Sequence, residues 1–374
     1  MDINRRVFMA GTAAATGLIA GGPGRAVEKP AGASDYFGPG PGEALLSRNE
    51  NPYGPAPSAL SAISQCASKG CYYADKGVEK LSAMIAERHG VRKEQVVLGS
   101  GSTEILCAVA LAWGRSGMIV CPDLFWDTTV LYGERQGAKS LRVPLKADMN
   151  VDLAAMDAAT GEGVSLVHIC NPNNPTGMLV DPAGMRTFAE RITPKATLLV
   201  DEAYNELTDN PAANTVVDLV KEGKDIIVCR TFSKIYGMAG MRVGYAITSE
   251  KNAARIRGYL MSFGGNVSGL AAAIGSYDDA GFLERSKAMV REGREMILAA
   301  VKSAGLTALP CETNFVFVEV PDADAVKAAM AQRGIAIRGA YGTWKQYSRV
   351  STGKLEDVRR YAEALPQVID GLRG

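Results

Sequence analysis

One short segment combines a lysine with groups that suit a phosphate. Lys234 follows the apolar run 226–229, which is typical of a buried strand. A desolvated lysine has a lowered pKa and can act as a Schiff-base nucleophile toward a carbonyl. The hydroxyls of Thr231 and Ser233, and the guanidinium of Arg242 eight positions after the lysine, suit a phosphate. The segment therefore indicates a ligand with both a carbonyl and a phosphate, as in pyridoxal phosphate. The alternative interpretation is an ordinary connection with a solvated lysine and arginine.

Other polar segments follow expected strands, at the edge where an open α/β sheet binds its ligands. Residues 99–104 read Gly-Ser-Gly-Ser-Thr-Glu, whose glycines allow close backbone approach and whose helix N-terminus offers N–H groups to an anion. Glu104 occupies the place of the third glycine of a dinucleotide-binding G-x-G-x-x-G, which weakens that interpretation. The segments Asn-Pro-Asn-Asn-Pro-Thr-Gly at 171–177 and Asp-Glu-Ala-Tyr at 201–204 follow two further strands. Taken singly, these two segments are a turn and an acidic strand end.

Apolar runs of strand length alternate with helical patterns through the middle of the chain. The expected strands are 96–98, 118–120, 140–143, 166–169, 197–200 and 226–228, and the expected helices lie near 103–112, 127–136 and 182–191. This alternation predicts an α/β fold with a mostly parallel sheet between helices, to which 244–247 adds a strand of different orientation. Beyond residue 256, two long helical patterns, short strands and a final helix from Leu355 predict a smaller α+β unit.

Composition and charge limit the possible partners. The 374 residues contain 41 Lys and Arg against 40 Asp and Glu, so no overall field attracts nucleic acid or an anionic membrane. Seven scattered Cys and two His argue against a zinc site and a disulfide scaffold, and we expect no metal. The expected partners are small molecules or a second copy of the chain.

The first 30 residues have the layout of an export signal. Arg5 and Arg6 precede a small, mildly apolar run, and the adjacent arginines resemble a twin-arginine signal. The run is too short and too rich in Gly and Ala to span a bilayer. We expect residues 1–30 to be a leader for the twin-arginine route and the protein to be periplasmic, without membrane attachment once the leader is removed. The alternative is an accidental Arg-Arg pair in a cytoplasmic protein.

Taken together and in order, these motifs resemble the pyridoxal-phosphate-dependent aminotransferases of class I/II, of fold type I, and within them the histidinol-phosphate aminotransferase-like branch. The matching segments are 49–54, 73–75, 99–104, 171–177, 201–204, 232–234 with Arg242, and 348–353. The resemblance spans residue 45 to the end of the chain. It implies an N-terminal arm (31–57), a large cofactor-binding domain with the mostly parallel sheet (58–256) and a smaller α+β C-terminal domain (257–374).

The resemblance also implies a role for each motif residue. Lys234 would form the Schiff base with the cofactor and, once released, shuttle a proton. Asp201 would pair with the pyridinium nitrogen, which makes the ring an electron sink. Tyr204 and Asn174 would hydrogen-bond the cofactor's phenolic oxygen. The residues expected to hold the cofactor's phosphate are Ser102, Thr103, Thr231, Ser233 and Arg242.

Three further residues complete the implied site. Trp126 would stack on the cofactor, although an ordinary core role at a helix start is the alternative. Arg349, with Asn174 beside it, would hold the substrate carboxylate as a bidentate pair. Tyr73 would reach the phosphate of the neighbouring subunit's cofactor, which implies a homodimer with shared sites.

The implied reaction moves an amino group between an amino acid, or a histidinol-phosphate-like amine, and a 2-oxo acid. Thr103, Ala74 and Leu207 depart from the branch's usual residues, and an exported protein fits poorly with cytoplasmic histidine synthesis, so the resemblance supports the reaction more than the substrate. One alternative is a decarboxylase or lyase of the same fold that acts on an amino acid or amino acid phosphate. The other is a non-catalytic exported binding protein, against which the complete set of motif residues argues.

Overall fold

The computed structural model describes residues 36–373, and the residues from Pro41 onward belong to one compact unit. The expected leader, residues 1–30, lies outside the described residues, as does the beginning of the expected arm. Both therefore stay predictions.

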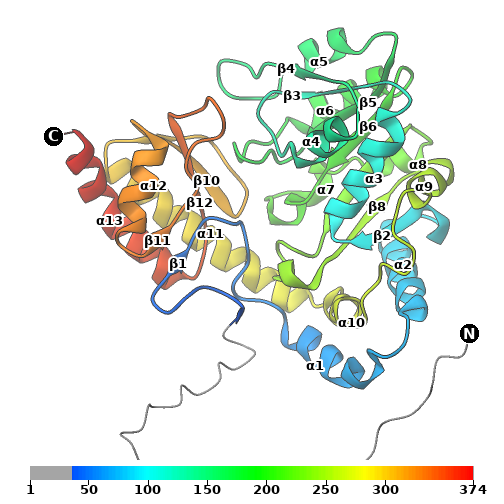
Figure 1. Cartoon of the computed structure of the whole chain (residues 1–374), viewed down its shortest axis with the longest axis horizontal. Helices are drawn as coiled ribbons and strands as arrows, with labels where there is room; N and C mark the ends of the chain where they lie inside the picture. The colour runs from blue at the N-terminus through cyan, green and yellow to red at the C-terminus, as the bar shows by residue number, and fades with distance from the viewer. Residues whose placement is uncertain (1–35, 374) are drawn as a thin grey trace, which may run out of the picture. The chain divides into compact units, whose positions relative to one another are not determined.

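Seven strands of the described chain form the central sheet, in the order β2-β8-β7-β6-β5-β3-β4 (Figure 1). They are β2 (Val96–Ser100), β3 (Met118–Pro122), β4 (Ser140–Val143), β5 (Val164–Cys170), β6 (Thr197–Asp201), β7 (Ile226–Thr231) and β8 (Val243–Ile247). β3 pairs in parallel with β4 and β5, and β6 pairs in parallel with β5 and β7, whereas β8 is antiparallel to both of its neighbours. The predicted mostly parallel sheet with a differently oriented strand at 244–247 is thus confirmed.

Helices cover both faces of this sheet, which explains why its strands are apolar almost throughout. One face packs against α3 (Ser102–Gly114), α4 (Thr128–Arg135) and α9 (Glu250–Arg257). The other packs against α2 (Asp75–His89), α5 (Leu153–Ala159), α6 (Pro182–Ile192) and α8 (Val217–Lys221). Successive strand residues alternate between the faces: Leu166 and Cys170 of β5 pack toward α3, whereas Val167 and Ile169 pack on the opposite side.

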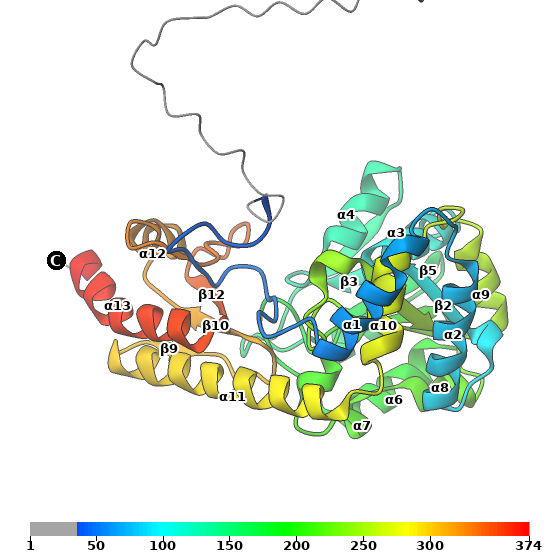
Figure 2. The same ribbon diagram turned by 90° about the horizontal axis from the view of Figure 1, so that it is seen from below.

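The C-terminal part of the chain forms a smaller layer of strands and helices (Figure 2). In it, β10 (Phe315–Glu319) lies between and antiparallel to β9 (Thr307–Ala308) and β12 (Tyr347–Ser351). Its helices are α11 (Ala280–Ser303), α12 (Ala323–Ala331) and α13 (Leu355–Arg373). A separate two-residue pairing joins β1 (Ala44–Leu45) of the arm to β11 (Ile335–Ala336).

Side-chain packing changes partway along α11. Phe282 and Val290 belong to the apolar cluster of the large sheet, whereas Ile297 and Val301 belong to the C-terminal cluster. The preceding helix α10 (Val267–Ser276) also packs with the large sheet's cluster and against α1 (Pro57–Cys66). The predicted boundary between the two domains, at residues 256 and 257, stays a prediction. The side-chain packing changes from the cluster of the large sheet to the C-terminal cluster within α11.

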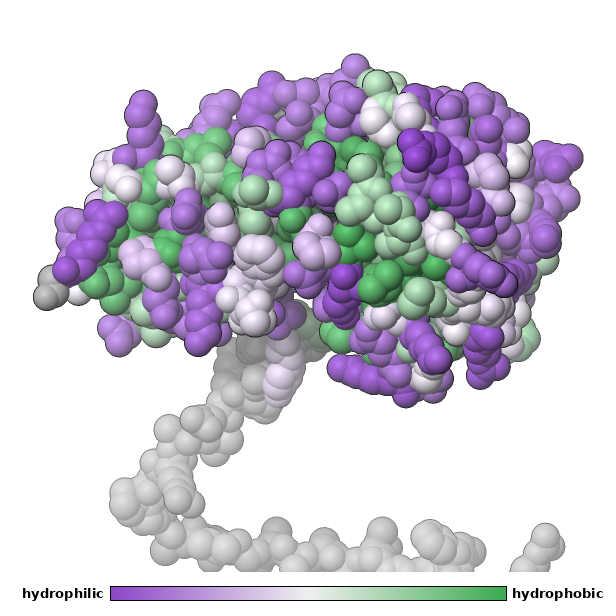
Figure 3. Space-filling view, turned by 90° about the horizontal axis from the view of Figure 1, so that it is seen from above, coloured by the Kyte–Doolittle hydropathy of each residue, from purple (hydrophilic) through white to green (hydrophobic). Residues whose placement is uncertain are grey.

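The described surface is mixed in polarity. Figure 3 shows polar side chains over much of one face, with hydrophobic areas between them. Among residues 36–373, none of the helices is long and apolar enough to cross a membrane.

Candidate active site

A cavity of about 740 Å³ opens where β5, β6 and β7 end. Its lining comes from three places: the strand ends and the loops after them, the arm at residues 47–50, and the C-terminal layer. Among the residues predicted from the sequence, those that line the cavity are Ser102, Thr103, Trp126, Asn174, Asp201, Tyr204, Thr231, Ser233, Lys234, Arg242 and Arg349. The structure therefore gathers every predicted site residue except Tyr73.

Lys234 lies just after β7, with its Nζ 5.5 Å from the centre of the Tyr204 ring. Burial and the positive charge of Arg349 lower the pKa of Lys234 to about 8, while the carboxylates of Asp201 and Glu50 act in the opposite direction. An amine with this pKa is partly neutral near neutral pH. It can therefore serve as a nucleophile and as a proton carrier.

Asp201 ends β6 and is only 3% exposed. The backbone N–H of Ala203 donates to its Oδ1 at 3.2 Å, and no ion pair holds it among the described residues. Burial raises the pKa of Asp201 to about 7, against the lowering effects of the Ala203 N–H and of Lys234. A cationic ring nitrogen at this carboxylate would favour the ionised form. The carboxyl group therefore fits a pyridinium partner.

Hydroxyl and guanidinium groups meet at the N-terminus of α3. Thr231 Oγ1 donates to Ser233 Oγ at 2.9 Å, and Arg242 Nη1 donates to the same Ser233 oxygen at 3.2 Å. Gly101, just before the helix, has a φ of 75°, which favours glycine, and a Cβ there would lie 2.0 Å from Arg242 Nη2 and displace the guanidinium. With the backbone N–H groups of Ser102 and Thr103 at the helix start, these residues form a site that suits a phosphate.

Arg349 projects from β12 and is 5% exposed. Its Nη1 donates to Asn174 Oδ1 at 2.6 Å and its Nη2 to the backbone oxygen of Ser47 at 2.8 Å. Its buried Nε has no hydrogen-bond partner among the described residues. Burial lowers the pKa of Arg349 because no carboxylate offsets the loss of water. A buried guanidinium with spare donors fits an anionic group on a ligand.

Sequence reasoning missed several lining residues. Asn49 of the arm donates through Nδ2 to the Tyr204 hydroxyl at 3.1 Å, and Lys327, Arg338 and Tyr341 line the side formed by the C-terminal layer. The arm motif at 49–54 was the available signal for Asn49. Lys327, Arg338 and Tyr341 belong to no motif, and only the pairing of residue 338 with Arg349 brings that arginine to the cavity.

Trp126 and Tyr73 differ in their placement. Trp126 lines the cavity and is partly exposed, and its stacking on the cofactor stays a prediction. Tyr73 is 75% exposed, lies outside the lining, and contacts Phe263 with ring centroids 4.7 Å apart. Its predicted role requires a second subunit, so the single chain leaves that role a prediction.

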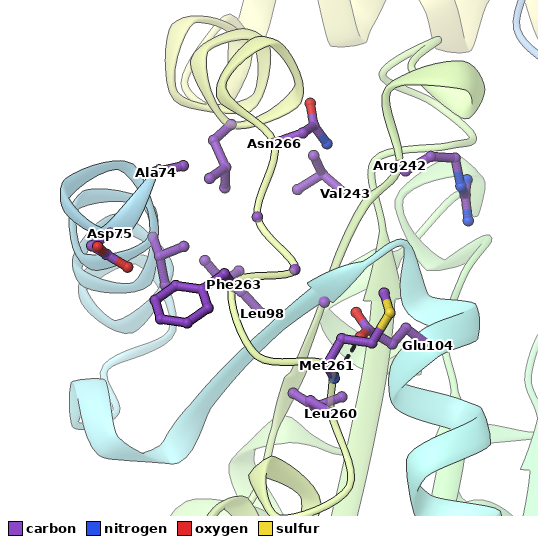
Figure 4. A pocket seen from close by; sticks show the side chains of 15 residues that line it. Ala74, Asp75, Leu98, Glu104, Arg242, Val243, Leu260, Met261, Phe263 and Asn266 are labelled. Atoms are coloured by element: carbon purple, nitrogen blue, oxygen red, sulfur yellow. Dashed lines mark hydrogen bonds between the residues drawn. The ribbon is translucent and has the colours of Figure 1, made fainter. Parts of the chain in front are cut away.

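A smaller cavity of about 200 Å³ adjoins the site through Arg242 (Figure 4). Figure 4 shows Phe263 and Met261 on one loop, with Glu104 accepting a hydrogen bond from the Met261 backbone N–H at 3.1 Å. The same carboxylate accepts from the Ser100 N–H at 2.6 Å. Glu104 thus ties the loop that carries Phe263 to the loop before α3.

Comparisons with known proteins agree with this arrangement. The family model described as aminotransferase class I and II matches residues 43–365. A histidinol-phosphate aminotransferase of Symbiobacterium thermophilum is 34% identical over 325 residues, covering 86% of this chain and 89% of that protein. Histidinol-phosphate aminotransferase 1 of Dechloromonas aromatica is 35% identical over 329 residues, covering 87% and 89% of the two chains.

A solved structure gives the same fold. The crystal structure of histidinol-phosphate aminotransferase from Sinorhizobium meliloti in complex with pyridoxal-5'-phosphate has a TM-score of 0.82 and 30% identity, covering 88% of this chain and 91% of that one. The fold, the cavity and these matches lead to one assignment: the chain belongs to the class I and II aminotransferases, the pyridoxal-phosphate-dependent transaminases of fold type I.

Proposed function

We propose that this transaminase takes its amino group from a donor that carries a phosphate or carboxylate, of the histidinol-phosphate type, and delivers it to a 2-oxo acid. The observation that carries the proposal is the positive side of the cavity, where Lys327, Arg338 and Arg349 all belong to the lining. None of the three forms an ion pair with a described residue. The Cζ atom of Arg338 lies 5.2 Å from the centre of the Tyr341 ring. Relatives named histidinol-phosphate aminotransferase support the same class of donor.

Pyridoxal phosphate, when bound, supplies a carbonyl for the amine and a ring that withdraws electrons from the reacting carbon. Lys234 would hold the carbonyl end and would carry the proton that leaves the substrate carbon, a task for which a pKa of about 8 is suited. Asp201 would keep the ring nitrogen protonated, and the hydroxyl of Tyr204 would donate to the phenolic oxygen. Trp126 would stack on the ring.

The phosphate of the cofactor would be held at the start of α3, by the backbone N–H groups of Ser102 and Thr103 and by the side chains of Thr231, Ser233 and Arg242. Arg349 would hold the anionic group of the substrate and so orient its reacting carbon. The orientation of the substrate decides which bond breaks, and therefore whether the enzyme is a transaminase or the alternative decarboxylase or lyase. Membership of the aminotransferase family favours transamination. Product formation that depends on added 2-oxo acid distinguishes the two.

Removal of individual cations tests the substrate class. We expect Arg338→Ala to lower kcat/KM for histidinol phosphate by roughly 10- to 100-fold, because it loses one charge-assisted hydrogen bond of about 1.5–3 kcal/mol. Arg349→Ala should lower kcat/KM for both the amine and the 2-oxo acid by at least as much, and Arg349→Lys should restore only part because Lys lacks the planar fork.

Arg333→Ala is the matched control, since Arg333 is exposed just after α12 and does not line the cavity. Steady-state kinetics of each variant with phosphorylated and unphosphorylated donors supply the measurement. Equal kcat/KM for Arg338→Ala and Arg333→Ala with every donor would refute the anionic-donor proposal.

A homodimer with shared sites is the second part of the proposal. Tyr73 is exposed beside Phe263, which is 68% exposed, and Tyr72 and Met261 add further exposed apolar surface. Large exposed apolar surface on a folded protein often marks a contact surface. In the dimer, each Tyr73 would reach the phosphate end of the neighbouring subunit's cavity, whose Arg242 also lines the smaller cavity beside Phe263.

Mixed dimers test the sharing of sites. A subunit with Lys234→Ala paired with one carrying Tyr73→Ala contains one intact site only if Tyr73 serves its neighbour. We therefore expect mixed dimers to regain activity with parental cofactor affinity. Alone, Lys234→Ala should lack activity and Tyr73→Ala should lack parental cofactor affinity. Activity measured against cofactor concentration after subunit exchange gives the result. No recovery in dimers shown to be mixed would place Tyr73 in its own subunit's site, and parental cofactor affinity of Tyr73→Ala alone would place it outside any site.

Export by the twin-arginine route is the third part of the proposal, supported by Arg5 and Arg6 ahead of the short apolar run. Residues 1–30 fused to a reporter should carry it across the inner membrane. The Arg5→Lys, Arg6→Lys pair should abolish export, because Lys is not an equivalent of Arg for a receptor that reads the pair. Fractionation of cells expressing both fusions provides the measurement. Reporter found only in the cytoplasm with the native pair would contradict the export proposal.

A further inference from the structure

Two side-chain amides surround the hydroxyl of Tyr204. Asn174 Nδ2 and Asn49 Nδ2 each lie 3.1 Å from Tyr204 Oη. Asn174 belongs to the loop after β5, whereas Asn49 belongs to the arm, 155 residues before Tyr204 in the chain. Tyr204 itself is buried just after β6 and is one of the residues that line the cavity.

Arg349 fixes the orientation of the Asn174 amide. A guanidinium only donates hydrogen bonds, so the atom of Asn174 that lies 2.6 Å from Arg349 Nη1 must be the carbonyl oxygen Oδ1. The NH2 group of Asn174 then faces Tyr204, and the tyrosine oxygen is the acceptor in that contact.

Ser351 fixes the orientation of the Asn49 amide in the same way. The backbone N–H of Asn49 donates to Ser351 Oγ at 2.9 Å, and the Ser351 hydroxyl donates in turn to Asn49 Oδ1 at 2.6 Å. If the amide were turned over, Ser351 would face a second donor and its own proton would lose this acceptor. Asn49 has a φ of 56°, a left-handed conformation that Asn adopts more readily than most residues.

With both amides oriented in this way, Tyr204 Oη accepts a hydrogen bond from each of them. The hydroxyl proton of Tyr204 is used in neither hydrogen bond and is therefore available to another acceptor. We infer that Asn49 is a positioning residue, which together with Asn174 turns the Tyr204 O–H toward the cavity and strengthens it as a donor to the cofactor's phenolic oxygen. Burial raises the pKa of Tyr204 above its usual value, so the hydroxyl keeps its proton at neutral pH. The inference rests on the proposed role of Tyr204.

The same contacts connect the docking of the arm to the donor strength of Tyr204. Asn314 Nδ2 donates to the backbone oxygen of Asn49 at 2.8 Å, and Arg349 Nη2 donates to that of Ser47. An arm that left this position would remove one of the two amides from Tyr204. Arm docking and the electronic state of the bound cofactor should therefore change together.

Absorbance titration of the bound cofactor tests the role of Asn49. A donor to the phenolic oxygen stabilises the form in which that oxygen is negatively charged, and so lowers the pH midpoint of the absorbance change. Asn49→Gly removes the amide without strain at a positive φ. We expect it to raise the midpoint by roughly half to one pH unit, the equivalent of one ordinary hydrogen bond. Asn49→Asp, which offers Tyr204 an acceptor instead of a donor, should raise it further.

Two reference variants separate the possible outcomes. Tyr204→Phe should raise the midpoint at least as much as Asn49→Gly. Asn314→Ala removes one hydrogen bond to the backbone of Asn49 but leaves the arm docked through Ser351 and Arg349, with both amides at Tyr204. It should therefore lower the melting temperature of the cofactor-free protein and leave the midpoint close to the parental value. If both Asn49 variants kept the parental midpoint while Tyr204→Phe shifted it, the inference about Asn49 would be overturned and the proposed role of Tyr204 would stand. A parental midpoint in Tyr204→Phe would overturn the proposed role of Tyr204 and the inference with it.

Discussion

The burial of charged side chains around the cavity, at the ends of β6 and β7 and on β12, is the constraint on which the rest of the structure depends. Asp201 and Arg349 are 3% and 5% exposed, and neither forms an ion pair within the described chain. Removing an ionised group from water costs several kcal/mol unless it is paired. The raised pKa of Asp201 and the lowered pKa values of Lys234 and Arg349 have this common origin. A ligand with a cationic ring nitrogen and anionic groups elsewhere offsets these costs.

The fold supplies a rigid frame for this arrangement. Immediately beside Asp201 and Thr231 in the sequence, Glu202 and Arg230 form a buried ion pair at 2.8 Å, and Arg230 also donates to Thr215. This pair joins the ends of β6 and β7, the two strands that carry the acid and the lysine segment. Breaking a buried pair by removing one partner typically costs about 3–5 kcal/mol. The frame therefore keeps Asp201 and Lys234 in register with each other.

Much of the large sheet could be predicted because its strands are buried on both faces, and such strands are continuous apolar runs between polar loops. Their carboxyl ends then place Asn174, Asp201 and Lys234 at one edge without any further information. The pairing of β1 with β11 could not be predicted, because two-residue strands carry no periodic pattern. Asn49 and Arg338 were missed because tertiary pairing brings them to the cavity. Ser351 contacts Asn49 from the far end of the chain, and an isolated bridge pairs Arg338 with Arg349.

Lys234 carries the central claim, and the site of covalent attachment tests it most directly. The protein is incubated with pyridoxal phosphate, reduced with borohydride and digested with a protease. The masses of the peptides are then measured by mass spectrometry. The account predicts one cofactor mass per chain, on the peptide that contains Lys234, and none on Lys327, the other lysine of the cavity lining. Attachment mainly to another lysine, or no attachment while the absorbance shows the cofactor bound, would contradict it.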